Sequence, residues 1–260
     1  MAIPIALVTP CFNGGAFLAA AMDSIIGQTY PALEYGVMDG GSTDGSLTIV
    51  EARREHLAFY ESGPDGGMYD ALNKGFARTS APIMGWLNAD DLHCPWTLQT
   101  VSDIFETLPD VDWITTAHPL VWDGRGLPVR CRPRGPYGRK AFRGGHFLPR
   151  AGVVTGGWIQ QESTFWRRSL WEKAGGTLNT SFKLAADFDL WARFFVQADL
   201  VAVDVPLAGF RRHGDQQSLN QAGLYEAEAL QSLERHGGKV WAASKAGFWE
   251  AGRRILPRRL

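Results

Sequence analysis

Residues 5–41, which read IALVTPCFNGGAFLAAAMDSIIGQTYPALEYGVMDGG, decide the fold class. The apolar run at 5–10 has the length of a buried strand, and residues 15–28 place apolar side chains at helical spacing. A second short apolar run follows at 33–41. A strand, a helix and a strand in this order predict parallel strands joined by a helix that covers the sheet.

The same alternation continues beyond this stretch. The expected elements are a helix from Thr43 to about Arg54, a strand at 57–62, a helix at 67–79 and a strand at 82–91. In the less regular second half we expect helices at 168–175, 187–198 and 216–236, and one or two strands over 200–210. This alternation predicts an α/β fold with a mostly parallel, Rossmann-like central sheet and helices on both faces.

Composition narrows the class of protein. The chain has 260 residues, 45% of them hydrophobic, and a net charge of −1, which is typical of a globular domain with no general attraction to nucleic acid. Three cysteines without a CxxC pair predict neither a disulfide framework nor a structural zinc site. The N-terminus resembles a strand rather than a signal peptide, and no apolar run reaches 18 residues. We therefore expect a cytoplasmic protein.

Polar residues follow each of the first four expected strands, as TPCFNGG, DGGSTDG, ESGPDGG and NADD. Ligands of parallel sheets gather at the carboxyl ends of the strands. Turn chemistry accounts for the glycines and for Ser42, but not for Asp39 or for the adjacent Asp90 and Asp91. These carboxylates predict a divalent cation that bridges to a phosphorylated ligand. The alternative is that Asp90 or Asp91 caps a helix starting near Pro95.

A long segment rich in Gly and Arg occupies residues 123–152, DGRGLPVRCRPRGPYGRKAFRGGHFLPRAG. It is too long for an ordinary turn, so we expect it to be functional or mobile. Its cationic side chains could meet phosphates or lipid headgroups, or simply be solvated, and both interpretations stay open.

Several ordered motifs resemble the inverting family 2 glycosyltransferases, which have the GT-A fold. They are the opening stretch through DGGSTDG, then SGPDGGMYDALNKG (62–75), LNADDL (87–92) and a long motif at 159–194. The resemblance covers roughly residues 3–213. It implies a GT-A domain over 1–213, with a nucleotide-binding half at 1–92 and an acceptor-binding half at 93–213. Residues 214–260 would then be a C-terminal helical tail.

The resemblance implies roles for the residues of the first half. Pro10, Phe12 and Asn13 match a P-x-Y-N element whose aromatic ring lies against the nucleotide base, with Phe in place of Tyr. Asp39 would accept a hydrogen bond from the base, and Asp65 would approach the nucleotide. By the same resemblance Asp90 would face the ribose and the metal, and Asp91 would bind Mg²⁺ or Mn²⁺ on the donor diphosphate.

The second half supplies the implied base and the acceptor side. Asp187 matches the catalytic base, although the Glu that precedes it in the family is Ala186 here. On spacing alone Asp187 could equally be a helix N-cap, with Asp189 as another candidate cap. His213 lies where some relatives place a third metal ligand, but a lone His is more often structural. We expect Gln161, Glu162 and Trp191 on the acceptor side, Trp158, Trp166 and Trp171 in the core, and a surface ion pair between Asp70 and Lys74.

The resulting hypothesis is a metal-dependent inverting transferase that moves a hexose from a nucleoside-diphosphate sugar to a saccharide or lipid-linked hydroxyl. Cell-surface polysaccharide or glycolipid synthesis would be its setting. The resemblance favours UDP as the nucleotide. The alternative is a non-catalytic sugar-nucleotide-binding or scaffold protein on the same fold. TPCFNGG contains no Lys or Arg, which argues against a nucleotidyltransferase, and no GxGxxG follows a strand as an NAD enzyme requires.

The pattern of residues 239–260 allows two interpretations. As a helix they would place Trp241, Phe248, Ala251 and Ile255 on one face, with cationic residues off that face. This is the pattern of a helix at an anionic membrane surface, which would add peripheral membrane contact on the cytoplasmic face. A helix docked on the protein body fits the pattern equally well.

Overall fold

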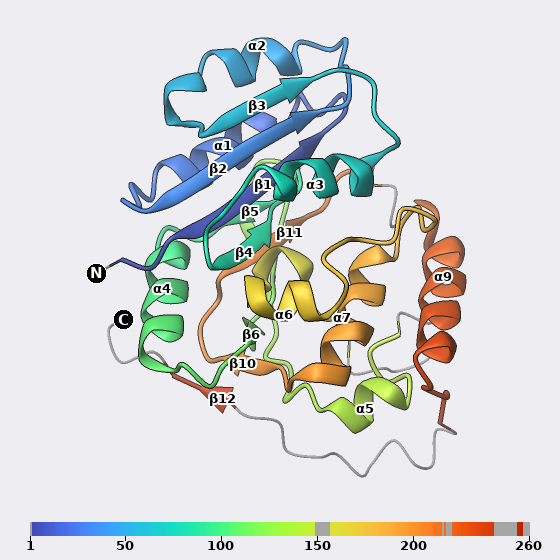
Figure 1. The fold of residues 1–260 in the computed structure, drawn as a ribbon. Helices are drawn as coiled ribbons and strands as arrows, with labels where there is room; N and C mark the ends of the chain where they lie inside the picture. Colours follow the sequence, from blue (N-terminus) through green and yellow to red (C-terminus); the bar gives the residue numbers. More distant parts are fainter. Residues whose placement is uncertain (1, 149–156, 215, 217–219, 242–253, 257–260) are drawn as a thin grey trace.

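The computed structural model describes residues 2–148, 157–214, 216, 220–241 and 254–256, which form two sheets with helices around them (Figure 1). The larger sheet has the strand order β12-β10-β6-β9-β4-β1-β2-β3. Its strands pair in parallel except β9, which is antiparallel to both β4 and β6. The mostly parallel central sheet is therefore confirmed.

The first half follows the predicted alternation closely. Its elements are β1 (Ile5–Cys11), α1 (Leu18–Ile26), β2 (Leu33–Asp39), α2 (Ser46–Glu51), the 3₁₀ turn η1 (Arg54–His56), β3 (Phe59–Ser62), α3 (Met68–Ala77) and β4 (Ile83–Trp86). The largest difference from the predicted boundaries is at the end of β4. The strand expected to reach residue 91 ends at Trp86, and a turn follows in which the amide of Asp91 donates to the carbonyl of Asn88 at 3.2 Å.

The second half adds the remaining strands and a small sheet. Its elements are β5 (Leu92–His93), α4 (Thr97–Thr107), β6 (Trp113–Thr116), β7 (Leu120–Trp122), β8 (Pro128–Cys131), α5 (Arg139–Arg143), η2 (Gln161–Ser163), β9 (Phe165–Arg167), α6 (Arg168–Lys173), α7 (Ala186–Gln197), β10 (Val201–Val203), β11 (Ala208–Arg211), α9 (Ala222–Arg235) and β12 (Arg254–Ile255). The small sheet has the order β5-β11-β7-β8. The segment 200–210, where one or two strands were expected, supplies two, because β10 lies in the large sheet and β11 in the small one.

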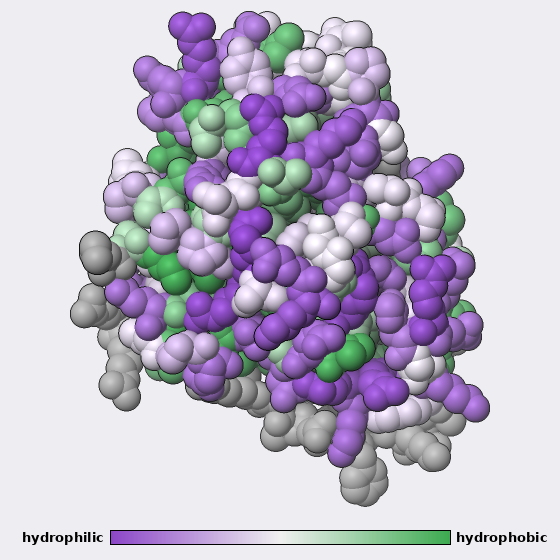
Figure 2. Space-filling model, viewed as in Figure 1, coloured by the Kyte–Doolittle hydropathy of each residue, from purple (hydrophilic) through white to green (hydrophobic). Residues whose placement is uncertain are grey.

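Helices cover both faces of the large sheet because successive strand residues point to opposite sides. In β1, Leu7 packs into a core cluster with residues of α1, α2 and α4, whereas Val8 packs into a second cluster with residues of α3, α6 and α7. Gly75 lets α3 approach the sheet closely, since a Cβ there would lie 2.6 Å from Cγ1 of Val8. The face of the molecule seen in Figure 2 is mainly hydrophilic, with apolar residues in small separate patches.

The C-terminal tail is helical at α9, which spans Ala222–Arg235 within the expected helix 216–236 and packs beside α7 (Figure 1). Residues 217–219, at the expected start of this helix, lie outside the described residues. The helix expected over 239–260 differs at its described ends. The amide of Trp241 donates to the carbonyl of Gly144 outside any helix, and Arg254–Ile255 form an edge strand of the large sheet. Phe248 and Ala251 lie outside the described residues. None of the described helices is long and apolar enough to cross a bilayer.

Candidate active site

Asp39 is the last residue of β2, at the carboxyl edge of the large sheet, and its side chain is buried. The hydroxyl of Ser62, at the end of β3, donates to it at 2.6 Å, and Ser42 donates from both its amide, at 3.1 Å, and its hydroxyl. A carboxylate offers about four lone-pair sites, so these bonds orient Asp39 and leave capacity for a further donor.

Phe12 and Asp65 both lie against Gly40 at this edge. A Cβ on Gly40 would meet the Asp65 carboxylate at 3.0 Å and the Phe12 ring at 3.3 Å. The Phe12 ring is 68% exposed, which is unusual for a large apolar side chain at the end of a buried strand. An open aromatic face beside two carboxylates, Asp39 and Asp65, is an arrangement that suits a flat, polar-edged ligand such as a nucleotide base.

Unlike the exposed Phe12, Asn13 forms hydrogen bonds with a neighbouring loop and Pro10 is buried. Asn13 has a positive φ of 52°, which Asn tolerates better than most residues, and its side-chain oxygen accepts from the amide of Thr43 at 2.9 Å. The backbone amide of Asn13 donates to the hydroxyl of Ser42 at 2.7 Å. Asn13 therefore joins the loop after β1 to the loop after β2, while Pro10 is buried within β1.

Asp90 and Asp91 follow β4 and face different partners. Asp91 is 1% exposed, and its carboxylate accepts from the amide of Arg211 at 2.9 Å and from the side-chain nitrogen of Asn88 at 3.2 Å. Asp90 is partly exposed and lies 2.9 Å from Nε2 of His213, which the sequence hypothesis also grouped with it. Neither Asp caps a helix, since α4 begins after Trp96 without a side-chain cap, so the capping alternative is wrong.

Glu162, in η2, adds a further buried carboxylate near Asp90 and Asp91. Its Oε1 atom has no hydrogen-bond partner in the described part of the chain. Burial raises the pKa of Glu162 to about 8, and the negative charges of Asp90 and Asp187 act in the same direction. Burial, Glu162 and Asp90 likewise raise the pKa of Asp91 well above its usual range. Burial and mutual repulsion thus both disfavour the ionised form of these carboxyl groups.

Asp187 lies in the first turn of α7, where the N-cap position is Ala185 and has no side-chain cap. The hydroxyl of Tyr225, from α9, donates to its carboxylate, with 3.1 Å to each oxygen. Burial raises the pKa of Asp187 to about 6, although the Tyr225 bond and backbone amides oppose the shift. The N-cap alternative for Asp187 is thus wrong. Asp189 is not a cap either, because its carboxylate binds Arg193, Ser232 and His236.

The segment before α7 is held from two sides, which fixes the position of Asp187. The Glu228 carboxylate of α9 accepts the amides of residues 183–185 at 2.8, 2.9 and 3.0 Å, which anchors the chain immediately before α7. The hydroxyl of Tyr69, in α3, donates to the carbonyl of Leu184 at 2.6 Å. The C-terminal tail is consequently part of the site.

Five residues expected on the acceptor side or in the core differ in how the structure places them. Gln161 is buried and donates to the carbonyl of Trp86 at 2.7 Å, so its amide supports the scaffold. Trp191 is 1% exposed and stacks on Trp86 and Trp113, so the expectation that it lines the acceptor side is wrong. Trp166 and Trp171 are core residues as expected, but Trp158 is only partly buried.

Sequence reasoning missed Tyr225 and Glu228. A Tyr and a Glu three residues apart on a polar helix were their only signal, and many solvated helices have such a pair. In contrast, the expected ion pair between Asp70 and Lys74 is present, at 2.8 Å.

The carboxylates also allow a test of whether the site suits a divalent metal ion. Among the described residues, no group of three or more His, Cys, Asp or Glu side chains is arranged as a metal cluster. The donor types nevertheless fit Mg²⁺ or Mn²⁺, which prefer carboxylate oxygens and accept imidazole. One buried oxygen of Glu162 has no hydrogen-bond partner in the described part of the chain, so a bound cation could occupy that place. Burial and the neighbouring carboxylates raise the pKa of Asp91 and Glu162 although the Arg211 guanidinium is nearby, and a cation would favour their ionised forms.

This architecture, a mostly parallel sheet with carboxylates at its carboxyl edge, is that of a GT-A glycosyltransferase. The structure of S. aureus TarS 1-349 in complex with UDP-GlcNAc is similar, with a TM-score of 0.66 at 15% identity, covering 94% of this chain and 69% of that one. Glucosyl-3-phosphoglycerate synthase from Mycobacterium tuberculosis, in complex with Mn²⁺, UDP and phosphoglyceric acid, gives 0.59 at 18% identity, covering 93% and 80%.

Sequence comparison defines the family. The model of glycosyl transferase family 2 matches residues 6–145, so the chain belongs to glycosyltransferase family 2. An uncharacterized glycosyltransferase of Rickettsia prowazekii (strain Madrid E) is 25% identical over 226 residues, which is 85% of this chain and 69% of the relative. One of Mycobacterium tuberculosis (strain ATCC 25618 / H37Rv) is 26% identical over 212 residues, 81% of this chain and 76% of the relative.

Proposed function

We propose that this protein is a metal-dependent inverting hexosyltransferase that uses a nucleoside-diphosphate sugar, with UDP as the nucleotide. The acceptor is a hydroxyl of a saccharide or a lipid-linked molecule, as in the synthesis of cell-surface polysaccharide or glycolipid. One observation carries the proposal: Asp187, whose pKa burial raises to about 6, shares an acidic cluster with Asp90 through Glu162.

Inversion is a single displacement at the anomeric carbon, so it requires a base at the acceptor and stabilisation of the leaving group. Asp187 is the proposed base, because a carboxylate with a pKa near 6 is largely deprotonated at neutral pH yet still accepts a proton. Asp90 and Asp91, with His213, would hold Mg²⁺ or Mn²⁺, which supplies positive charge to the departing diphosphate. The buried Asn88 and Arg211 contacts keep Asp91 in place.

The nucleotide would lie at the edge formed by β1 and β2. The exposed Phe12 ring offers a stacking surface, and Asp39, which Ser42 and Ser62 orient, is positioned to accept from a ring N–H such as that of uracil. UDP is also the nucleotide named for the TarS and synthase complexes. A Pyrobaculum calidifontis mannosyltransferase of similar fold is in complex with GDP-Man and Mn²⁺, so GDP belongs in the test.

Calorimetric titration of UDP, GDP and dTDP, each with and without Mn²⁺, tests the proposal. We expect one nucleotide to bind in a manganese-dependent manner, and Asp91→Asn to lose that binding. Asp199→Asn is the matched control, because Asp199 is an exposed carboxylate whose partner is Arg139 on the surface. If the folded protein binds none of the three nucleotides, the non-catalytic scaffold is favoured instead.

A further inference from the structure

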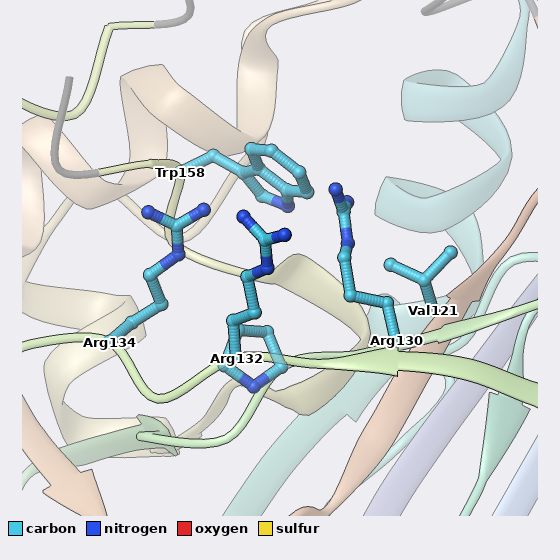
Figure 3. Close-up of a pocket in the computed structure, with 6 residues that line it drawn as sticks. Val121, Arg130, Arg132, Arg134 and Trp158 are labelled. Atoms are coloured by element: carbon cyan, nitrogen blue, oxygen red, sulfur yellow. The ribbon is translucent and has the colours of Figure 1, made fainter. Parts of the chain in front are cut away.

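Three arginines project into one hollow of the acceptor half. Its lining consists of Pro119, Val121, Arg130, Arg132, Arg134 and Trp158. Arg130 lies in β8, and the chain continues without helix through Arg132 and Arg134. Alternate residues of an extended segment point to the same side. Figure 3 accordingly shows the three guanidinium groups directed toward the indole of Trp158.

The hollow gathers three positively charged side chains, and two of them have no anionic partner among the described residues. Arg130 and Arg132 form no ion pair with any carboxylate that the structure describes. Burial and the charges of Arg212, Arg132 and Arg134 lower the pKa of Arg130. By contrast Arg125, in the same hairpin, pairs with Asp123 at 3.1 Å. Neighbouring like charges repel, and an anion bound between them would turn this repulsion into attraction.

The backbone is adapted to hold the arginines against the indole. Gly157 has φ +91°, and a Cβ there would lie 3.0 Å from Cζ of Arg134. A side chain at 157 would therefore push the guanidinium away from Trp158, the next residue. The amide of Arg134 donates to the carbonyl of Ala117 at 2.7 Å, which anchors the extended segment at this point. Planar guanidinium groups bind phosphate oxygens in pairs of parallel hydrogen bonds, and indole faces suit sugar rings.

The small sheet connects this hollow to the acidic cluster. Arg130 pairs with Val121 in β7, and Val121 pairs with Phe210 in β11. Two strand spacings, about 10 Å, therefore separate Arg130 from β11. The next residue of β11, Arg211, donates its amide to Asp91. Trp158 also precedes Glu162 by only a few residues.

We propose that Arg130, Arg132 and Arg134, together with Trp158, bind a phosphate ester carried by the acceptor, so that this transferase acts on a phosphorylated acceptor. The inference rests on the proposed function, because it assigns the hollow to the acceptor rather than to the donor. A polyprenyl phosphate in a bilayer and a soluble sugar phosphate present the same group to the arginines.

The experiment compares the full chain with the double variant Arg130→Gln/Arg132→Gln and the control Arg125→Gln, after thermal melting has confirmed that all three fold. One arm titrates a soluble hexose phosphate by calorimetry. The other measures co-sedimentation with phosphatidylcholine vesicles that contain or lack a polyprenyl phosphate. The arm that gives binding identifies the source of the phosphate.

We expect phosphate-dependent binding in one arm, and a loss of affinity of about tenfold or more in the double variant, because hydrogen bonds to charged groups are lost. Arg125→Gln should bind as the unmodified chain does. Absence of binding in both arms, or equal binding by the double variant, would overturn the inference.

Titration of UDP with Mn²⁺ in parallel separates the two proposals. Unchanged UDP binding by the double variant supports an acceptor site, whereas its loss would assign the arginines to the donor and overturn the inference. If the unmodified chain itself fails to bind a nucleotide, the proposed function fails. The phosphate arms then decide only whether the hollow binds an anion.

Discussion

The hydroxyl of Tyr225 lies 3.1 Å from both carboxylate oxygens of Asp187, and this contact joins the C-terminal helix α9 to the proposed catalytic base. One hydroxyl proton is shared between two oxygens, so the bond favours the ionised carboxylate without fully satisfying it. The result is a carboxylate whose pKa of about 6 is a balance between burial and hydrogen bonding.

Asp187→Asn should lower kcat by at least about a hundredfold while donor binding is retained, because the amide cannot accept the proton of the acceptor. Sugar transfer and calorimetric UDP binding are the two measurements. Asp199→Asn serves as the surface control. Full activity of Asp187→Asn would mean that another residue is the catalytic base.

Tyr225→Phe should move the acidic limb of the kcat profile to higher pH. The base acts when deprotonated, so activity rises with pH through about 6, and removal of the Tyr225 bond raises this pKa further. A hydrogen bond to a charged group is worth ~1.5–3 kcal/mol, so the expected shift is about one unit. Tyr60→Phe, at an exposed position of β3, should leave the profile unchanged. An unshifted limb in Tyr225→Phe would contradict the assignment.

Glu162→Gln should flatten the dependence of stability on pH in metal-free protein. The pKa of Glu162 is about 8 in the folded chain against an ordinary value of 4.5. The folded state therefore holds a proton that the unfolded state releases, and the free energy of unfolding falls as pH rises between these values. Denaturant unfolding across this window measures the slope. Glu172→Gln, at an exposed position of α6, is the control. A slope in Glu162→Gln equal to that of the unmodified chain would refute the explanation.

Glu228→Gln should destabilise the fold by about 1–3 kcal/mol, since three backbone amides lose their charged acceptor. Glu234→Gln, on the exposed side of the same helix, should change stability by less than about 0.5 kcal/mol. Denaturant unfolding compares the two. Similar values for both variants would mean that the start of α7 is held by other contacts.

Phe12→Ala should weaken nucleotide binding without a loss of stability, because the ring is exposed. Stacking of a base on an aromatic ring is worth ~1–3 kcal/mol, so the affinity should fall by about five- to a hundredfold. Calorimetry with the preferred nucleotide measures this loss. Phe12→Tyr keeps the stacking surface and should bind the nucleotide as well as the unmodified chain does. Equal binding by Phe12→Ala would mean that the nucleotide base does not stack on this ring.

The strand and helix pattern of the first half could be predicted because its period depends only on local sequence. The ends of β1 and β2 fall within two residues of expectation, since turn residues such as Gly40 follow them directly. The end of β4 was placed too late, because the apolar period does not reveal that Asn88 and Asp91 form a turn. The role of Trp191 was misjudged for a related reason: an aromatic residue in an amphipathic helix can face the core or a ligand, and only packing decides which.

The sequence by itself determined the fold class, the family resemblance and the positions of Asp39, Asp90, Asp91 and Asp187, because each follows a recognisable local motif. The tertiary structure alone decided which groups meet. Tyr225 and Glu228 reach Asp187 and the start of α7 from a helix about forty residues later. Arg130 comes close to β11 through pairing across the small sheet. Such contacts depend on how distant segments pack, and burial, which sets the pKa of Asp187, exists only once they have packed.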